Sequence, residues 1–196
     1  MSTFNLYADF KKGIIPNSIT LLGIILMIIS IILFDKGLLL PALAFFVSGW
    51  IADLFDGWSA RKYKRISQIG TFFDPLADKF NTIVYLIYFW NNISIIISIT
   101  IIAIGVSLTV LRIYKWYYGK KKNIEYNIMA RNAGKIKTNV ERSAFCLFLL
   151  IPICQKYFFE INQTIETNII TFINWIFVAS IIFAILSLHK QIQEIS

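Results

Sequence analysis

Residues 17–34 read NSITLLGIILMIISIILF and contain no charged side chain. A helix needs roughly 20 mostly apolar residues to cross the hydrocarbon part of a bilayer, and this run approaches that length. Its apolar residues follow one another without polar alternation, so they indicate a helix rather than a strand of a membrane barrel. The stretch therefore predicts a first transmembrane helix.

Five further apolar runs follow, at residues 38–58, 72–90, 93–114, 140–158 and 168–188. The chain has 196 residues and is 57% hydrophobic, whereas soluble domains are usually about 45–50% apolar. These runs leave no room for a separate soluble domain. We predict an all-α, polytopic integral membrane protein with six transmembrane helices, forming one domain over residues 1–196. Residues 1–15 mix apolar and polar side chains and predict a short N-terminal interfacial helix.

The positive charges indicate how these helices are oriented. The chain has a net charge of +8. Most lysines and arginines lie before the first run, between the second and third, between the fourth and fifth, or near the C-terminus. The opposite side has only Lys36 and Lys156. Cytoplasmic loops carry the excess of Lys and Arg, so both termini are predicted to be cytoplasmic.

Four of the 11 acidic residues lie in residues 53–78, DLFDGWSARKYKRISQIGTFFDPLAD. Asp53 and Asp56 end the second run, and Asp74 and Asp78 begin the third. Spacings of three and four residues place each pair on one helical face. We expect all four carboxylates to meet at the cytoplasmic edge of the membrane. Because carboxylates held together repel one another, the arrangement calls for a bound cation.

The ligand types restrict that cation. Carboxylate oxygens without Cys or His favour Mg²⁺, Mn²⁺ or Ca²⁺, and the single histidine, His189, is far from the stretch. Gly57 and Ala60 are small enough to let a ligand approach, and Arg61 can form two hydrogen bonds to a phosphate. These features favour a metal–diphosphate site. The alternative is that the aspartates are ordinary helix-end residues.

The complete pattern is D-x-x-D-G-x-x-A-R, eight residues, then G-x-x-x-D-x-x-x-D. It is formed by Asp53, Asp56, Gly57, Ala60, Arg61, Gly70, Asp74 and Asp78. This pattern resembles the signature of the CDP-alcohol phosphatidyltransferase family. The resemblance implies an enzyme of phospholipid biosynthesis that moves a phosphatidyl group from CDP-diacylglycerol to an alcohol and releases CMP.

The resemblance also implies roles for these residues. Asp53, Asp56 and Asp74, with Asp78 contributing, would hold two Mg²⁺ or Mn²⁺ ions. Asp78 would also be the catalytic base that accepts the proton of the alcohol. The residues implied to bind the CDP group are Asp53, Gly57, Ala60, Arg61 and Gly70.

Within this family, the stretches 16–20 (PNSIT), 72–79 (FFDPLADK) and 134–138 (GKIKT) are similar to bacterial phosphatidylglycerophosphate synthases. The implied acceptor is sn-glycerol 3-phosphate. Its phosphate would bind Arg112, Lys135 and Lys137. Two positions depart from that pattern, because Gly23 replaces an arginine and Ile104–Gly105 replaces an Arg-Glu pair. The other acceptors considered are phosphatidylglycerol (as in cardiolipin synthase), inositol phosphate and serine.

The resemblance further implies a homodimer that works among membrane lipids, with no nucleic-acid partner. The distribution of Lys and Arg predicts an active site facing the cytoplasm, and the high content of Ile, Asn and Lys favours a bacterial inner or cell membrane. Two alternatives from other classes of function are a divalent-cation transporter and a catalytically silent scaffold. Transporters place such sites near the bilayer midplane, often within an inverted repeat. The aspartates are instead expected at one face, and the motif occurs once.

Overall fold

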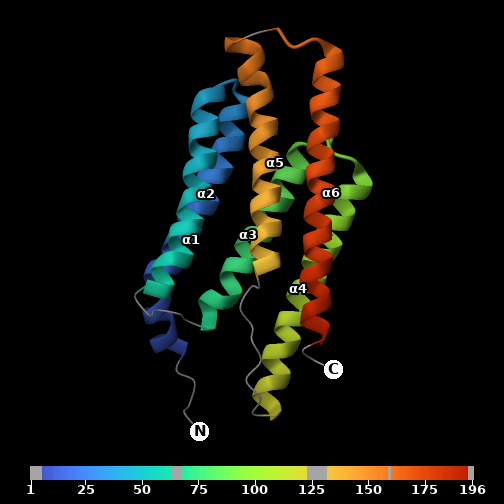
Figure 1. Ribbon diagram of the computed structural model, residues 1–196. Helices are drawn as coiled ribbons and strands as arrows, with labels where there is room; N and C mark the ends of the chain where they lie inside the picture. Colours follow the sequence, from blue (N-terminus) through green and yellow to red (C-terminus); the bar gives the residue numbers. More distant parts are fainter. Residues whose placement is uncertain (1–5, 63–67, 123–131, 159, 194–196) are drawn as a thin grey trace. The chain divides into compact units, whose positions relative to one another are not determined.

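The computed structural model describes residues 6–62, 68–122, 132–158 and 160–193, without the side chains of 6–17, 56–62, 68–75, 116, 120–122 and 132. The helices in this part are α1 (Leu6–Asp35), α2 (Leu39–Lys62), α3 (Gln68–Tyr88), α4 (Ile95–Lys122), α5 (Asn132–Tyr157) and α6 (Gln163–Gln193) (Figure 1). No strand occurs in the described ranges. The prediction of an all-α protein is therefore confirmed for these residues.

Three helices contain stretches long and apolar enough to cross a membrane, namely Ser18–Asp35, Ile95–Gly119 and Gln163–Gln193. A shorter apolar stretch, Leu39–Phe55, lies in α2. Each of the six predicted spans coincides with one of the six helices of the described part, although composition alone supports three as spans. The described part of the segment predicted to be interfacial, residues 6–15, forms the first turns of α1, which begins at Leu6.

The chain divides into two compact units, Met1–Asn81 and Thr82–Ser196. In the first unit, α1 and α2 form a hairpin (Figure 1). Gly37 closes α1 with a φ of 74°, a left-handed conformation that glycine adopts without strain. The Gly37 N–H donates to the Phe34 carbonyl at 2.9 Å, and the Leu38 N–H donates to the Leu33 carbonyl at 3.0 Å. These bonds form a Schellman motif, which ends α1 and reverses the chain.

Close backbone contact holds the two helices of this hairpin together. A β-carbon on Gly49 would lie 2.8 Å from Cγ of Met27 and 3.0 Å from the carbonyl oxygen of Gly23. Nearer the turn, the Ser30 hydroxyl donates to the Ala42 carbonyl at 2.8 Å. Small residues at such crossings let helix backbones approach closely in a membrane.

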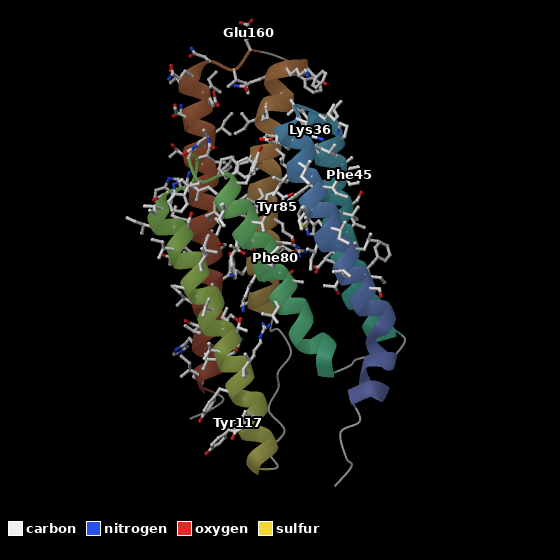
Figure 2. All side chains as sticks on the ribbon, turned by 180° about the vertical axis from the view of Figure 1, so that it is seen from behind. Lys36, Phe45, Phe80, Tyr85, Tyr117 and Glu160 are labelled. Carbon is white, nitrogen blue, oxygen red and sulfur yellow. The ribbon has the colours of Figure 1, made fainter. Side chains whose placement is uncertain are left out.

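An aromatic cluster forms the core of the second unit. The ring centroids of Tyr85 and Phe145 lie 5.2 Å apart, those of Phe89 and Phe148 lie 5.0 Å apart, and those of Phe145 and Phe177 lie 5.1 Å apart. All five rings are buried. The cluster thus joins α5 and α6 to the part of α3 that belongs to this unit, where Figure 2 labels Tyr85.

A polar contact in the second unit involves the side chain of Asn174 on α6. The Asn174 side-chain amide donates to the Asn92 carbonyl at 3.0 Å, and its oxygen accepts from the Ser94 N–H at 3.1 Å. This contact ties α6 to the segment between α3 and α4. Figure 2 marks Glu160 and Tyr117 at opposite ends of this unit.

Candidate functional site

The four aspartates lie on two consecutive helices. Asp53 and Asp56 belong to α2, and Asp74 and Asp78 belong to α3. Asp56 lies six positions before Lys62, the last residue of α2. Asp74 lies six positions after Gln68, the first residue of α3. Helical spacing places each pair on one face, as the sequence predicted.

The structure describes only part of this predicted metal site. The side chains of Asp53 and Asp78 are half-buried, whereas those of Asp56 and Asp74 lie outside the described side chains. Within the described part of the chain, no group of three or more Asp, Glu, His or Cys residues could hold a metal ion. The meeting of all four carboxylates around a cation therefore stays a prediction.

The positions predicted to bind the CDP group also lie on these helices. Gly57, Ala60 and Arg61 belong to the last turns of α2, and Gly70 belongs to the first turn of α3. Their side-chain environments lie outside the described side chains. Their contact with the nucleotide stays a prediction as well.

A group of buried cations lies in the second unit. Arg112 is 8% exposed and Lys115 is 1% exposed on α4, whereas Lys137 is 7% exposed on α5. Arg142 is also buried on α5. Both α4 and α5 pack against α6. Of the three residues predicted to bind the acceptor phosphate, Arg112 and Lys137 are thus buried and Lys135 is exposed.

The face of α6 that is buried in this unit changes character along its length. It begins with the apolar Ile173 and Phe177 and continues through Ser180, Ala184, Ser187 and Gln191. Ser180 lies beside Glu141, and a β-carbon on Gly134 would lie 3.4 Å from Oγ of Ser187. Glu141 and Gly134 belong to α5, so α5 and α6 are antiparallel neighbours. The half of α6 with small and polar residues lies along the first turns of α5.

Two polar atoms of this half are buried without a hydrogen-bond partner in the part of the chain that the structure describes. They are Oγ of Ser187 and Oε1 of Gln191. Buried polar atoms are usually hydrogen-bonded, so such atoms are available to a small polar molecule. The buried Lys137 lies on α5 between Gly134 and Glu141, so this region is polar and contains a buried cation.

Glu141 is the one buried acidic side chain among those the structure describes, and it is 1% exposed. Its Oε1 lies 3.3 Å from Nζ of Lys137 and 3.4 Å from Oγ of Ser180. Its Oε2 lies 3.5 Å from Oγ1 of Thr82. Three helices of the second unit, α3, α5 and α6, therefore contribute partners to one carboxylate.

The sequence motifs include none of Lys115, Glu141 and Arg142. A local signal existed for two of them, because Lys115 follows Arg112 by three positions and Glu141 follows Lys137 by four. Among the described side chains of this unit, four buried cations therefore accompany a single buried acid. Cations such as Arg112 and Lys137 are the groups that bind small anions such as phosphate.

The family model for CDP-alcohol phosphatidyltransferase matches residues 13–167. This chain belongs to the CDP-alcohol phosphatidyltransferase family. The match contains the complete aspartate motif as well as Arg112, Lys137 and Glu141. The family prediction is therefore confirmed.

Several bacterial relatives carry the name CDP-diacylglycerol–glycerol-3-phosphate 3-phosphatidyltransferase. The Pectobacterium atrosepticum protein is 30% identical over 111 residues, and the match covers 55% of this chain and 59% of the relative. The Mycoplasma pneumoniae protein is 28% identical over 153 residues, covering 77% and 60%, respectively. The Salmonella choleraesuis protein is 26% identical over 149 residues, covering 70% and 78%.

The chain spans between 52% and 60% of the length of the first four curated relatives that it matches. These relatives share one name, so they agree on the donor and the acceptor of the reaction they are named for. Their names describe those proteins, and the reaction of this family member is a separate question.

Proposed function

We propose that this protein transfers a phosphatidyl group from CDP-diacylglycerol to sn-glycerol 3-phosphate, giving phosphatidylglycerophosphate and CMP for phospholipid biosynthesis. Family membership and the shared name of the relatives support the type of reaction. The observation that carries the choice of acceptor is the burial of Arg112 and Lys137 on two helices that pack against α6. Buried cations of this kind match a small acceptor that carries its own phosphate.

The acids of α2 and α3 fit a pair of Mg²⁺ or Mn²⁺ ions, because the donor set consists of carboxylate oxygens at helical spacings. Asp53, Asp56, Asp74 and Asp78 would hold the ions. When bound, such ions supply the positive charge that offsets the diphosphate and the departing CMP. Asp53, Gly57, Ala60, Arg61 and Gly70 would orient the nucleotide, with the small residues allowing close approach.

Asp78 would be the catalytic base. It accepts the proton of the acceptor hydroxyl as the hydroxyl oxygen attacks the phosphatidyl phosphorus. The bond between that phosphorus and the oxygen bridging to CMP breaks, and CMP leaves with the electron pair. No covalent enzyme intermediate is needed, so the protein acts by positioning its substrates and stabilising charge.

The acceptor phosphate would bind Arg112 and Lys137, with the exposed Lys135 adding attraction from the surface. Arg112 suits this role because its planar guanidinium can donate two parallel hydrogen bonds. Inositol phosphate offers the same anionic group, and phosphatidylglycerol offers a phosphodiester. Serine carries no phosphate and offers only its carboxylate as an anionic group.

In the membrane, we propose that all six helices cross the bilayer as a single domain with both termini in the cytoplasm. The first turns of α1 would lie at the interface. The active site would face the cytoplasm of a bacterial inner or cell membrane, and the protein would work as a homodimer among membrane lipids. The distribution of Lys and Arg supports this orientation.

The test is an assay of the purified full chain with radiolabelled CDP-diacylglycerol and Mg²⁺, following CMP release with each acceptor added singly. Release with sn-glycerol 3-phosphate that is abolished by Asp78→Asn and by EDTA supports the proposal. Release only with phosphatidylglycerol, inositol phosphate or serine keeps the chemistry and overturns the acceptor. If no alcohol releases CMP, the proposed transfer itself is wrong.

A further inference from the structure

Glu141 stands out because its carboxylate pairs with Lys137, one of the buried cations proposed to bind the acceptor phosphate. A negative charge there opposes the binding of an anion. It is nevertheless 1% exposed and has hydrogen-bonding partners on three helices. Burying a carboxylate costs several kcal/mol before its partners compensate. A side chain that weakens anion attraction at such a cost calls for a specific role.

The geometry around the carboxylate shows what it fixes. Its Oε1 forms a 3.3 Å ion pair with Nζ of Lys137, one helical turn earlier in α5. On the other oxygen, the Thr82 hydroxyl is a donor at 3.5 Å. The Ser180 hydroxyl has a single proton, which it directs to the Phe177 carbonyl at 2.8 Å or to Glu141 at 3.4 Å. The carboxylate is therefore held from α3 and α6, and it holds the lysine.

Holding the lysine matters because its ammonium is carried on a long, flexible stem. A lysine side chain loses about 1.5–2 kcal/mol of rotamer freedom when it is fixed. If Glu141 accepts one of its three N–H groups, the stem is fixed before any ligand binds, and the other two groups remain available. Fixing a binding group in advance lowers the entropic cost of binding.

The buried charged side chains of the second unit are mostly positive. Arg112, Lys115, Lys137 and Arg142 are all buried in the same unit, and Glu141 is the one buried acid there among the described side chains. One carboxylate thus neutralises a fraction of the positive charge. It orients a cation without removing the attraction for a phosphate.

We propose that Glu141 is a positioning residue for the acceptor, which holds the Lys137 ammonium in the orientation that binds the acceptor phosphate. This inference rests on the proposed function. Glu141 itself touches neither substrate, and it acts through Lys137, with Thr82 and Ser180 fixing its carboxylate from the neighbouring helices.

The first test is Glu141→Gln, which keeps the shape of the side chain and removes its charge. We expect the KM for sn-glycerol 3-phosphate to rise about tenfold, the size expected for losing one charge-assisted hydrogen bond. The kcat and the KM for CDP-diacylglycerol should stay within about twofold, because the metal and nucleotide residues are untouched. A fall in kcat with an unchanged acceptor KM would indicate a purely structural role and overturn the inference.

A double-mutant cycle then tests whether Glu141 acts through Lys137. Lys137→Met removes the ammonium, and Glu141→Gln is combined with it. If Glu141 works by orienting Lys137, the second substitution should raise the acceptor KM less than twofold further in the Lys137→Met background. Independent, multiplying effects on KM would show that Glu141 does not act through the lysine.

A charge swap separates positioning from folding. Each of Lys137→Glu and Glu141→Lys alone breaks the ion pair, whereas the two together restore one. The thermal stability of the double variant in detergent should therefore be closer to that of the wild type than the stability of either single variant. Acceptor affinity should not return, because the ammonium now occupies the other position. Recovery of both would mean that the pair is needed for stability alone.

Thr82→Val provides a second route if Glu141→Gln does not fold. It removes the hydroxyl that holds Oε2 and leaves the ion pair in place. We expect a smaller rise in acceptor KM of about two- to fivefold. An unchanged KM would contradict the inference. If the wild-type protein releases no CMP with sn-glycerol 3-phosphate, the proposed acceptor is wrong. If the wild type turns over normally but Glu141→Gln and Lys137→Met have independent effects on the acceptor KM, only the positioning role is wrong.

Discussion

The carbonyl oxygen of Gly49 lies 3.3 Å from the point where a β-carbon on Gly23 would stand. Gly23 is also one of the two positions at which the sequence departs from the phosphatidylglycerophosphate synthase pattern. A longer side chain there would meet the backbone of α2. The packing of α1 on α2 therefore gives a structural reason for a glycine at this position.

The same crossing predicts the effect of a single methyl group. Gly49→Ala should lower the free energy of unfolding by about 1–3 kcal/mol, because its β-carbon would approach both Met27 and the Gly23 backbone. Thermal unfolding of the purified protein in detergent measures the change. Gly134→Ala is the matched control, since its β-carbon would meet Oγ of Ser187 at an ordinary 3.4 Å. Equal effects of the two substitutions would contradict the close packing described for α1 and α2.

The turn after α1 predicts a loss of stability that comes from strain alone. No atom lies within 4 Å of the β-carbon that Gly37→Ala would add, but the φ of 74° disfavours alanine. We expect a loss of about 1 kcal/mol. Gly37→Asn should cost less, because asparagine adopts this conformation more readily. If alanine and asparagine cost the same, the left-handed turn does not persist in the membrane-embedded protein.

Removing the divalent ions should stop the reaction. EDTA should abolish CMP release and excess Mg²⁺ or Mn²⁺ should restore it, because the diphosphate charge would otherwise stay unbalanced. Asp56→Asn should reduce kcat by about 100-fold or more, in the range seen when a group that stabilises the transition state is lost. Asp35→Asn is the control, since Asp35 is an exposed acid at the end of α1. Full activity of Asp56→Asn, or activity in EDTA, would contradict the metal assignment.

Two lysines on the same helix should differ in their effect on acceptor binding. Lys137→Met should raise the KM for sn-glycerol 3-phosphate by about 10- to 100-fold, because a buried cation interacts strongly with a phosphate. Lys135→Met should raise it about threefold or less, since Lys135 is exposed and screened by solvent. Steady-state kinetics at fixed CDP-diacylglycerol measures both. A larger effect at Lys135 would place the acceptor at the surface of α5 and not beside its buried face.

The sequence predicted all six helices of the described part because each contains an apolar run, but it underestimated their lengths. The fourth run was predicted to end at residue 114, whereas α4 continues to Lys122, and the last run was predicted over 168–188, whereas α6 covers Gln163–Gln193. Hydropathy measures the part of a helix that fits the bilayer. Polar turns outside that layer continue the helix without an apolar signal.

The candidate site was predictable where its residues are close in sequence. The aspartate motif could be read directly because helical spacing relates its members. Glu141 could not be recognised in this way, since its partners Thr82 and Ser180 are 59 and 39 positions away. No local pattern relates such residues, and their proximity follows from the packing of whole helices.

The short turn at Gly37 has a consequence for the order in which the protein is assembled. The hydrogen bond from Ser30 to Ala42 joins residues 12 positions apart, whereas the bond from Asn174 to Asn92 joins residues 82 positions apart. At about 5–20 residues per second, the ribosome needs about 3.5–14 seconds to make that difference in chain length. The α1–α2 hairpin can therefore pack while translation continues, and Thr82 must wait for α5 to be synthesised before Glu141 can reach it.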